Sequence, residues 1–243
     1  MRMIKTVCIG CLIWSRAFLF SACAQGTFQN LSFESANIPP STPIPSFVPI
    51  SEALPGWNGY FIDSSTSVAT PQSDVVYDGI STGGEGISII DKNESGFQPL
   101  QGNYSVLLFG GGAPSVVSAE ITQTGVVPTG TQSLLFEGYV SSTPFVVTLG
   151  GQTLNMIPLQ SFPNTGSYPP YTLYGGNIPS AFDGQSELLT FTEPAPAEMA
   201  PSMFELDDIS FSPQAVPEPS PFVLSGIGGL LFALYRRFAP KRK

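Results

Sequence analysis

Carboxylates offer most of the acid–base chemistry in this chain, which contains eighteen Asp and Glu residues and no histidine. Without histidine there can be no Ser-His-Asp triad, no Cys-His pair and no His-ligated metal site. A glycosidase needs two carboxylates about 5–9 Å apart, and Glu120 and Glu137, each within an alternating stretch, are the first to inspect. Among eighteen acids some pair meets that spacing by chance. We therefore expect both glutamates on outer sheet faces and predict that the chain is not an enzyme.

Tyrosines near predicted loops are the second group with chemistry to offer, because aromatic rings stack on the apolar faces of pyranose sugars. Tyr168, Tyr171 and Tyr174 lie in the stretch SYPPYTLYGG, which is rich in proline and glycine and is expected to be exposed. These three are the candidate sugar-binding residues. Trp57 follows a Leu-Pro-Gly turn, and we expect it in the core.

The three cysteines, Cys8, Cys11 and Cys23, all precede residue 25. The spacing of Cys8 and Cys11 imitates a redox or zinc motif, but the pair lies in an apolar segment without partner ligands. The remainder of the chain is therefore expected to fold without a disulfide.

The charges divide the chain into positive ends and an acidic middle. Eight of the nine basic residues lie in the first sixteen or the last eight positions, and Lys92 is the only basic residue between them. All eighteen acidic residues fall between Glu34 and Glu218. Such a surface repels phosphate backbones, so nucleic acid is excluded as a partner of the middle segment.

The N-terminus has the features of an export signal. A positive start is followed by an apolar segment, and Ala22-Cys23-Ala24 fits cleavage before Gln25. Residues 1–24 are thus predicted to be a signal peptide. Phe20-Ser21-Ala22-Cys23 also resembles a degraded lipobox, so lipidation at Cys23 is the alternative to ordinary cleavage.

The C-terminus has the features of a membrane anchor. Fourteen uncharged residues, 222–235, precede a tail with five basic residues. A span requires about 20 apolar residues, so the length is marginal, but a basic tail is expected to stay in the cytoplasm. We predict a transmembrane helix and basic tail in residues 222–243, after a Pro-rich linker in residues 214–221.

This end resembles a known sorting signal. Val216-Pro217-Glu218-Pro219, a short apolar helix with glycines and then Arg236-Arg237 are similar to the PEP-CTERM tail of exopolysaccharide-producing Gram-negative bacteria. The resemblance covers about the last thirty residues. It implies recognition of the Pro-Glu-Pro element by an exosortase, removal of the helix, and delivery from the inner membrane to the cell surface or medium. A plain anchor after a proline linker is the alternative.

Between the ends, residues 25–213 show short alternating or apolar stretches separated by Gly, Pro, Ser and Asn, which is typical of an all-β domain. The Pro-rich segment from Ile38 to Pro55 cannot join a central strand, so we expect a long loop or surface wrap. The predicted strands are Gly26–Phe33, Gly86–Ile90, Ser105–Phe109, Ala119–Gln123, Ser133–Val140, Phe145–Leu149, Thr153–Ile157, Tyr171–Asn177, Ser186–Thr192 and Phe204–Ser212.

A second, looser resemblance comes from scattered fragments: Asn30 to Glu34, Leu54-Pro55-Gly56-Trp57, Ile121-Thr122-Gln123 and Leu206 to Phe211. They are similar to galactose-binding-like jelly rolls, which implies a jelly-roll β-sandwich. In many members of that fold the first and last strands share a structural calcium ion, and the matching positions here are Glu34 and Asp207. Alternation places Asp207 on the face of Ile209 and Phe211, where calcium would balance its charge. Solvation or capping by backbone amides is the alternative.

The sequence thus predicts an exported, non-enzymatic envelope or matrix protein associated with exopolysaccharide or biofilm. The alternative is a carbohydrate-binding module of the cell envelope. Exposure of the three tyrosines around one concave face would favour the alternative.

Overall fold

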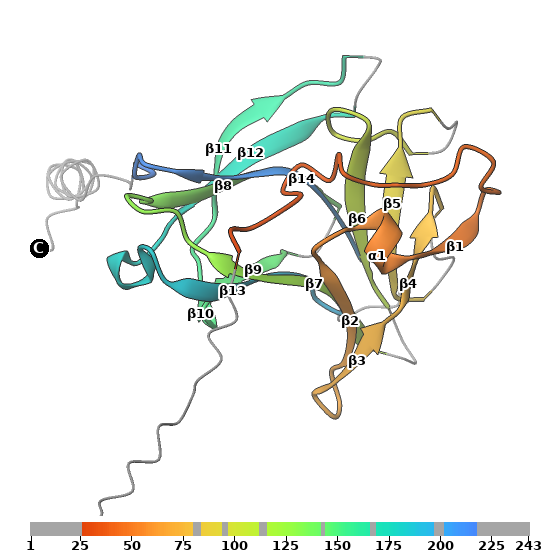
Figure 1. The fold of residues 1–243 in the computed structure, drawn as a ribbon, viewed down its shortest axis with the longest axis horizontal. Coiled ribbons are helices and arrows are strands. Elements are labelled where there is room, and N and C mark those ends of the chain that lie inside the picture. Colours follow the sequence, from red (N-terminus) through yellow and green to blue (C-terminus); the bar gives the residue numbers. More distant parts are fainter. Residues whose placement is uncertain are drawn as a thin grey trace, which may run out of the picture.

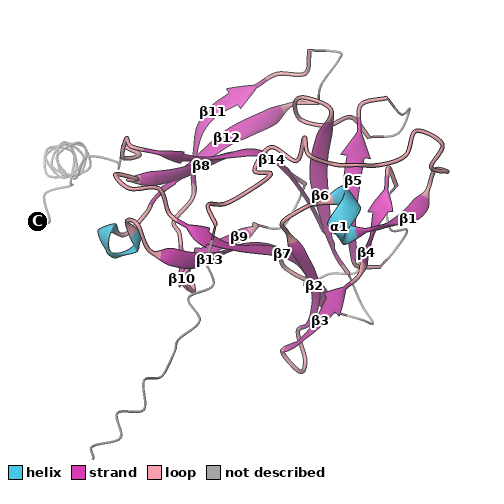
Figure 2. Cartoon of the chain, viewed as in Figure 1, coloured by secondary structure: helices cyan, strands magenta, loops and turns pink. Residues whose placement is uncertain are grey.

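The computed structural model describes residues 26–79, 84–93, 97–111, 116–141, 144–165, 169–196 and 202–217. Several predictions fall outside these ranges: the signal peptide, the membrane helix, Tyr168, Glu218, Pro219, Arg236 and Arg237. Over the described ranges the fold is all-β, with one four-residue helix, α1 (Ile50–Ala53), and one 3-10 turn, η1 (Ser180–Phe182) (Figure 2). No helix within those ranges is long and apolar enough to cross a membrane.

Two sheets pack against each other as a sandwich (Figure 1). The eight-stranded sheet has the order β1 (Ser46–Pro49), β4 (Asp74–Tyr77), β5 (Gly86–Asp91), β6 (Tyr104–Gly110), β14 (Ser202–Ser212), β8 (Ser133–Val140), β12 (Tyr171–Asn177) and β11 (Ile157–Phe162). The six-stranded sheet has the order β10 (Gln152–Thr153), β9 (Val146–Leu149), β13 (Ser186–Glu193), β7 (Val117–Val126), β2 (Asn58–Asp63) and β3 (Val68–Gln72). Neighbouring strands are antiparallel except for the parallel pair β4 and β5.

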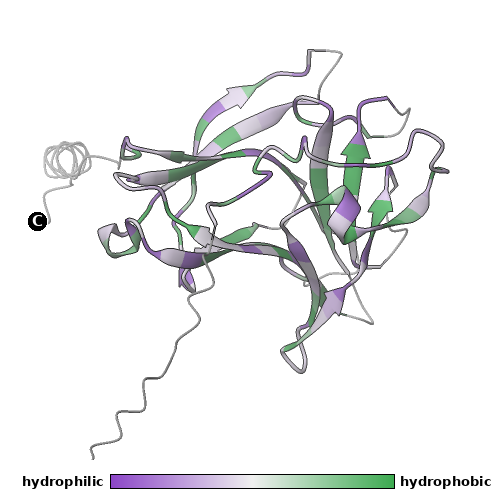
Figure 3. Cartoon of the chain, viewed as in Figure 1, coloured by the Kyte–Doolittle hydropathy of each residue, from purple (hydrophilic) through white to green (hydrophobic). Residues whose placement is uncertain are grey.

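Apolar residues recur along the strands of both sheets (Figure 3), and their side chains pack together as one core between the sheets. Phe136 lies at its centre, with ring centroids 5.2 Å from Phe145, 5.3 Å from Phe191 and 5.8 Å from Phe204. All three of these ring pairs meet edge to face, which is a favoured aromatic geometry. Trp57 is buried in the same core, as predicted, and its indole N–H donates to the Asn30 carbonyl at 3.1 Å.

Strand prediction succeeded where alternation was strong and failed at the periphery. Strands β8 and β12 have the predicted bounds, and six further predicted strands are present with shifted ends. Gly26–Phe33 is not a strand: it makes a single bridge, from Thr27 to Val126, because the chain turns through positive φ angles at Asn30 and Phe33. Thr153–Ile157 is not one strand: Thr153 ends β10, Ile157 begins β11, and residues 154–156 connect them.

The Pro-rich segment from Ile38 to Pro55 contains β1 and α1. Strand β1 lies at the edge of the eight-stranded sheet and pairs only with β4 among the described strands. An edge strand needs one hydrogen-bonding side only, so proline is tolerated there. The segment stays out of the sheet centre, as predicted, but it is not wholly a loop, because it forms an edge strand and a short helix.

Candidate ligand-binding face

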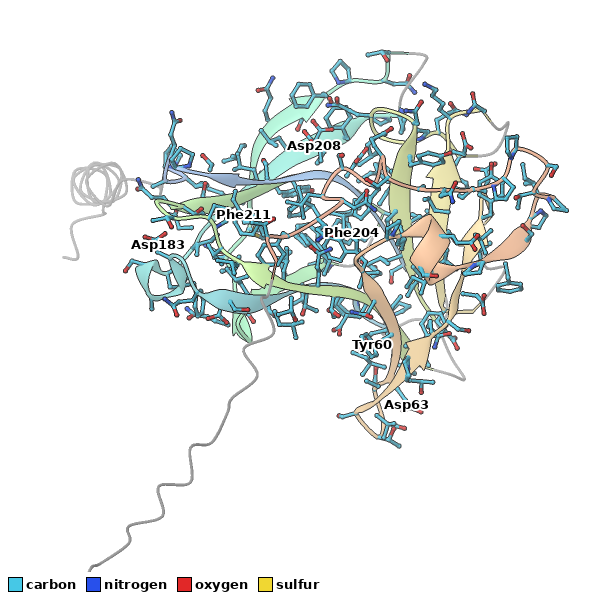
Figure 4. The ribbon with its side chains drawn as sticks, viewed as in Figure 1. Tyr60, Asp63, Asp183, Phe204, Asp208 and Phe211 are labelled. Atoms are coloured by element: carbon cyan, nitrogen blue, oxygen red, sulfur yellow. The ribbon has the colours of Figure 1, made fainter. Side chains whose placement is uncertain are left out.

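A β-bulge in β14 decides where the acidic residues of the last strand point. The pairing of β14 with β8 shifts between Asp207 and Ser210, and Asp208 has a φ of 43°. Leu206 and Ile209 therefore both face the core, while Asp207 lies on the outer face. In Figure 4, Phe204 and Phe211 lie on the side of β14 toward the second sheet, and Asp208 lies on the opposite side. The expectation that Asp207 shares the face of Ile209 is wrong, because the bulge inserts one residue.

The outer face of the eight-stranded sheet carries a row of buried acids. Asp207 on β14 lies directly opposite Glu137 on β8, and Glu205 lies two residues before Asp207. All three are buried. The described part of the loop before β6, residues 97–103, lies against this part of the sheet, where Gln101 bonds to Asp207 and Glu137. In that loop Phe97 packs on a small apolar cluster that includes Leu107. The sequence pattern predicted the face of Glu137 but not its cover.

Burial sets the protonation of these acids. It raises the pKa of Asp207 to about 8, against two backbone N–H donors that act to lower it. It raises the pKa of Glu137 to about 7, and the negative charge of Asp208 adds to the rise. It raises the pKa of Glu205 to about 8, although the Ser105 hydroxyl donates to it at 2.5 Å. Near neutral pH the row can therefore donate protons as well as accept hydrogen bonds.

An exposed amide connects the acids to the surface. The Gln101 side-chain nitrogen donates to Glu137 Oε1 at 2.5 Å and to the Tyr171 hydroxyl at 2.9 Å. The Gln101 backbone N–H donates to Asp207 Oδ2 at 3.1 Å. The second oxygen of Glu137 is buried and has no hydrogen-bond partner among the described residues. Gln101 thus holds Glu137 and Tyr171 in fixed positions.

Two aromatic rings complete this face. Phe162 on β11 and Tyr171 on β12 are register partners, and their rings stack with centroids 4.6 Å apart and planes 17° apart. Two shallow pockets, of about 250 and 280 Å³, are each lined by both rings. We call Gln101, Glu137, Phe162, Tyr171 and Asp207 the outer-face site. Its two pockets present aromatic surface beside a fixed polar amide.

The three predicted tyrosines do not form one group in the described structure. Tyr171 and Tyr174 are three residues apart on β12, so they point to opposite faces. Tyr174 packs in the core against Phe136, with centroids 5.4 Å apart, although both tyrosines border the 250 Å³ pocket near the strand ends. Tyr168 lies outside the described ranges. The sequence missed Phe162 and Gln101; Phe162 is out of phase with Ile157 and Leu159, and the pairing of β11 with β12 shifts between Pro158 and Gln160.

Glu34 and Asp207 lie on two sides of one short loop rather than facing a common space. Glu34 accepts the backbone N–H groups of Asn103 at 2.6 Å and Tyr104 at 3.1 Å, and also the Asn103 side chain at 2.5 Å. Asp207 accepts N–H groups from Gln101 and Asp208. Calcium takes six to eight oxygen ligands, whereas N–H donors point at these carboxylates. No group of three or more Cys, Asp or Glu in the described ranges is arranged to hold a metal. The donor set of Glu34 and Asp207 in this structure does not fit a shared calcium ion.

Glu120 and Glu137 cannot act together on one sugar. Glu120 lies on β7 between the core residues Ala119 and Ile121, so it faces outward from the six-stranded sheet. Glu137 faces outward from the other sheet. The Thr192 hydroxyl donates to Glu120 at 2.9 Å, and burial raises the Glu120 pKa. The carboxylate next to Glu137 is Asp207.

A larger cavity of about 490 Å³ lies elsewhere, between the edges of the two sheets. Apolar side chains from both sheets line it, among them Phe47, Phe61 and Ile87, with Asp74 and Glu85 also on its wall. It lacks the stacked rings and the hydrogen-bonded amide of the outer-face site. We therefore place the candidate ligand site on the outer face.

The described part of the chain thus defines a two-sheet β-sandwich with a carboxylate and aromatic site on one outer face. No protein-family model and no curated protein sequence matches the chain. Among solved structures, a cyclase from Fischerella sp. TAU matches at 15% identity over 79% of this chain and 98% of its own, with a TM-score of 0.42. A Stig cyclase from the same organism, bound to (3Z)-3-(1-methyl-2-pyrrolidinylidene)-3H-indole, matches at 15% identity over 76% of this chain and 94% of its own, with a TM-score of 0.42. A β-glucosidase from Kluyveromyces marxianus in complex with glucose matches at 13% identity over 85% of this chain and 20% of its own, with a TM-score of 0.31.

These matches correct the prediction that the chain is not an enzyme, because the similar solved structures are enzymes. That prediction relied on the lack of histidine in the chain. Lack of histidine excludes particular mechanisms, but a buried carboxylic acid with a pKa near 7, such as Glu137, can supply acid–base chemistry alone. At these identities and TM-scores the likeness assigns no activity, substrate or catalytic residue to this chain.

Proposed function

We propose that the chain is an exported envelope or extracellular-matrix protein, sorted by an exosortase, whose outer-face site binds extracellular polysaccharide. In this proposal residues 1–24 are the signal peptide, the β-sandwich is a galactose-binding-like jelly roll, and residues 222–243 form the inner-membrane helix and basic tail. The domain would enter the periplasm and reach the cell surface or medium after processing.

The stacked rings of Phe162 and Tyr171 carry the binding part of the proposal. Both rings are half-buried on an outer sheet face, and both border two pockets. A pyranose offers an apolar face for stacking and hydroxyls for hydrogen bonding. Gln101 lies beside Tyr171 and supplies a polar amide at the edge of the rings. Two pockets around one ring pair suit consecutive sugars of a polymer better than a single small molecule.

The positive ends around an acidic middle support the sorting part. The Pro-Glu-Pro element followed by an apolar stretch and Arg236-Arg237 is the feature on which it rests. Mass spectrometry of the mature protein tests it. We expect a new N-terminus at Gln25 and a C-terminus within residues 216–222, whereas a native protein with both ends intact would contradict the proposal.

A glycan array tests the binding part, with the purified full-length chain in detergent as the analyte. We expect binding to one or a few polysaccharides, and competition by the corresponding soluble oligosaccharide. Wild-type protein that binds no glycan would reject the binding role and leave a purely architectural matrix role.

A further inference from the structure

The segment that follows β14 is bound to the sandwich by hydrogen bonds. The Gln132 side-chain nitrogen donates to the Pro213 carbonyl at 2.6 Å, and the Ser133 hydroxyl donates to the Gln214 carbonyl at 2.7 Å. Two more hydrogen bonds follow at Val216. We call residues 213–216 the strap, since side chains of the sandwich hold it at both ends.

Asn177, the last residue of β12, binds Val216 as a neighbouring strand would. The Val216 N–H donates to Asn177 Oδ1 at 2.7 Å, and Asn177 Nδ2 donates to the Val216 carbonyl at 3.2 Å. One side-chain amide therefore occupies both backbone hydrogen-bonding groups of Val216. Any enzyme that binds the backbone here must displace Asn177.

The side chain of Val216 is held as firmly as its backbone. It is 6% exposed, whereas Ala215 and Pro217 on either side are exposed. A Cβ placed at Gly175 would lie 2.9 Å from Val216 Cγ2 and 2.7 Å from Leu159 Cδ1. A larger residue at Gly175 would displace Val216 or the neighbouring leucines, so Gly175 forms a notch on β12 for the strap.

The held residue is the first residue of the Val216-Pro217-Glu218-Pro219 element, so a single proline separates it from Glu218. Proline fixes φ and restricts the residue before it, so Pro217 provides little slack. A processing enzyme that binds an extended substrate across this element requires the same backbone groups that Asn177 occupies.

We propose that Asn177 and the Gly175 notch gate processing, by holding Val216 so that the strap must detach before an exosortase can bind the Pro-Glu-Pro element. This inference rests on the proposed sorting function. The folded sandwich would thereby set the rate at which its own tail is removed. Loss of the two hydrogen bonds to Val216 is expected to speed processing by roughly tenfold.

The first test uses elastase, which cleaves after small residues such as alanine and does not depend on any sorting enzyme. The full-length chain in detergent is digested, and cutting between Ala215 and Val216 is followed by mass spectrometry. We expect Asn177→Ala to be cut there roughly ten times faster than wild type, and Asn58→Ala, an exposed asparagine of the six-stranded sheet, to match wild type. Equal cutting rates for wild type, Asn177→Ala and Asn58→Ala would show that Asn177 does not hold the strap in place.

A second variant guards against misfolding. Val216→Ala keeps Asn177 and the backbone but removes two methyl groups from the notch, so it is also expected to be cut faster. The melting temperatures of both variants are measured alongside. Faster cutting with an unchanged melt supports local detachment, whereas faster cutting that appears only with a lowered melt overturns it in favour of global unfolding.

The gate itself is tested by pulse-chase in a bacterial host that carries an exosortase. Faster conversion of Asn177→Ala than of wild type supports gating. If wild type and Asn177→Ala mature at the same rate, gating is overturned and sorting stands. If neither chain matures while elastase still distinguishes them, the sorting proposal fails, and the gating proposal that rests on it fails as well.

Discussion

The two outer faces of the sandwich carry the same residue type with different consequences. Glu137 on β8 and Glu120 on β7 both alternate with core residues, and both project away from the core. A loop covers the region of Glu137, which is 6% exposed, whereas Glu120 is only partly buried and is hydrogen-bonded to Thr192. Alternation decides which face a residue takes, but a remote loop decides its protonation.

The largest expected difference between the two faces is in how the stability of the fold depends on pH. In the unfolded chain Glu205 ionises near its ordinary pKa of 4.5, whereas in the folded chain its pKa is about 8. Between these values the unfolded state has lost a proton that the folded state keeps, so stability is full below about pH 4.5 and falls as pH rises toward 8. Asp207 and Glu137 act in the same direction.

From the Glu205 shift alone we expect the free energy of unfolding to fall by on the order of 4 kcal/mol from pH 5 to pH 8.5, which is roughly 8–16 °C in melting temperature. Glu205→Gln keeps the shape without the charge, so it should melt higher than wild type at pH 8.5 and about equally at pH 5. Thermal melts across this pH range check both expectations. A melting temperature that rises with pH would refute buried, protonated acids on this face.

The second-largest expected difference between the two faces is in polysaccharide binding. Tyr171→Ala removes the ring that stacks on Phe162 and accepts from Gln101, so we expect roughly tenfold weaker binding to whichever polysaccharide the array identifies, since a stacked aromatic contributes about 1 kcal/mol or more. Titration calorimetry measures the change. Tyr60→Ala on β2 of the six-stranded sheet is the matched control and should bind as wild type. Equal losses in both variants would place the ligand elsewhere.

The sequence predicted the fold where short-range pattern suffices. β8 and β12 alternate strongly between turn residues, so their ends were predicted correctly. β2, β3 and β4 were not predicted, because their stretches are short and contain glycine, proline or polar residues, and pairing with neighbouring strands of their own sheets stabilises them. The Asp207 face was missed because no local rule places a bulge at Asp208.

The candidate site was predictable only in part. Tyr171 was identified because it follows two prolines at the start of a predicted strand, where a side chain is expected to be exposed. Phe162 reaches it through the pairing of β11 with β12, and Gln101 reaches it from a loop seventy positions earlier in the chain. Contacts of that range depend on the whole topology, which no local pattern encodes.

A smaller effect is expected when charge is removed from the other face. Glu120 is partly solvated, so Glu120→Gln should change the melting temperature by no more than roughly 2 °C at any pH between 5 and 8.5, as surface substitutions usually do. Melts of this variant beside Glu205→Gln make the comparison direct. A shift as large as that of Glu205→Gln would show that the loop over the eight-stranded sheet is not what distinguishes the two faces.

Metal removal should have the smallest effect. Five N–H hydrogen bonds, three to Glu34 and two to Asp207, already satisfy the carboxylates that the jelly-roll resemblance assigned to calcium. We therefore expect excess chelator to leave the melting temperature unchanged and Asp207→Asn to respond to chelator as wild type does. If chelator lowered the melting temperature of wild type but not of Asp207→Asn, and added calcium reversed the loss, the calcium site would be supported after all. That result would also mean that the loop from Leu100 to Tyr104 turns its N–H groups away when the ion binds.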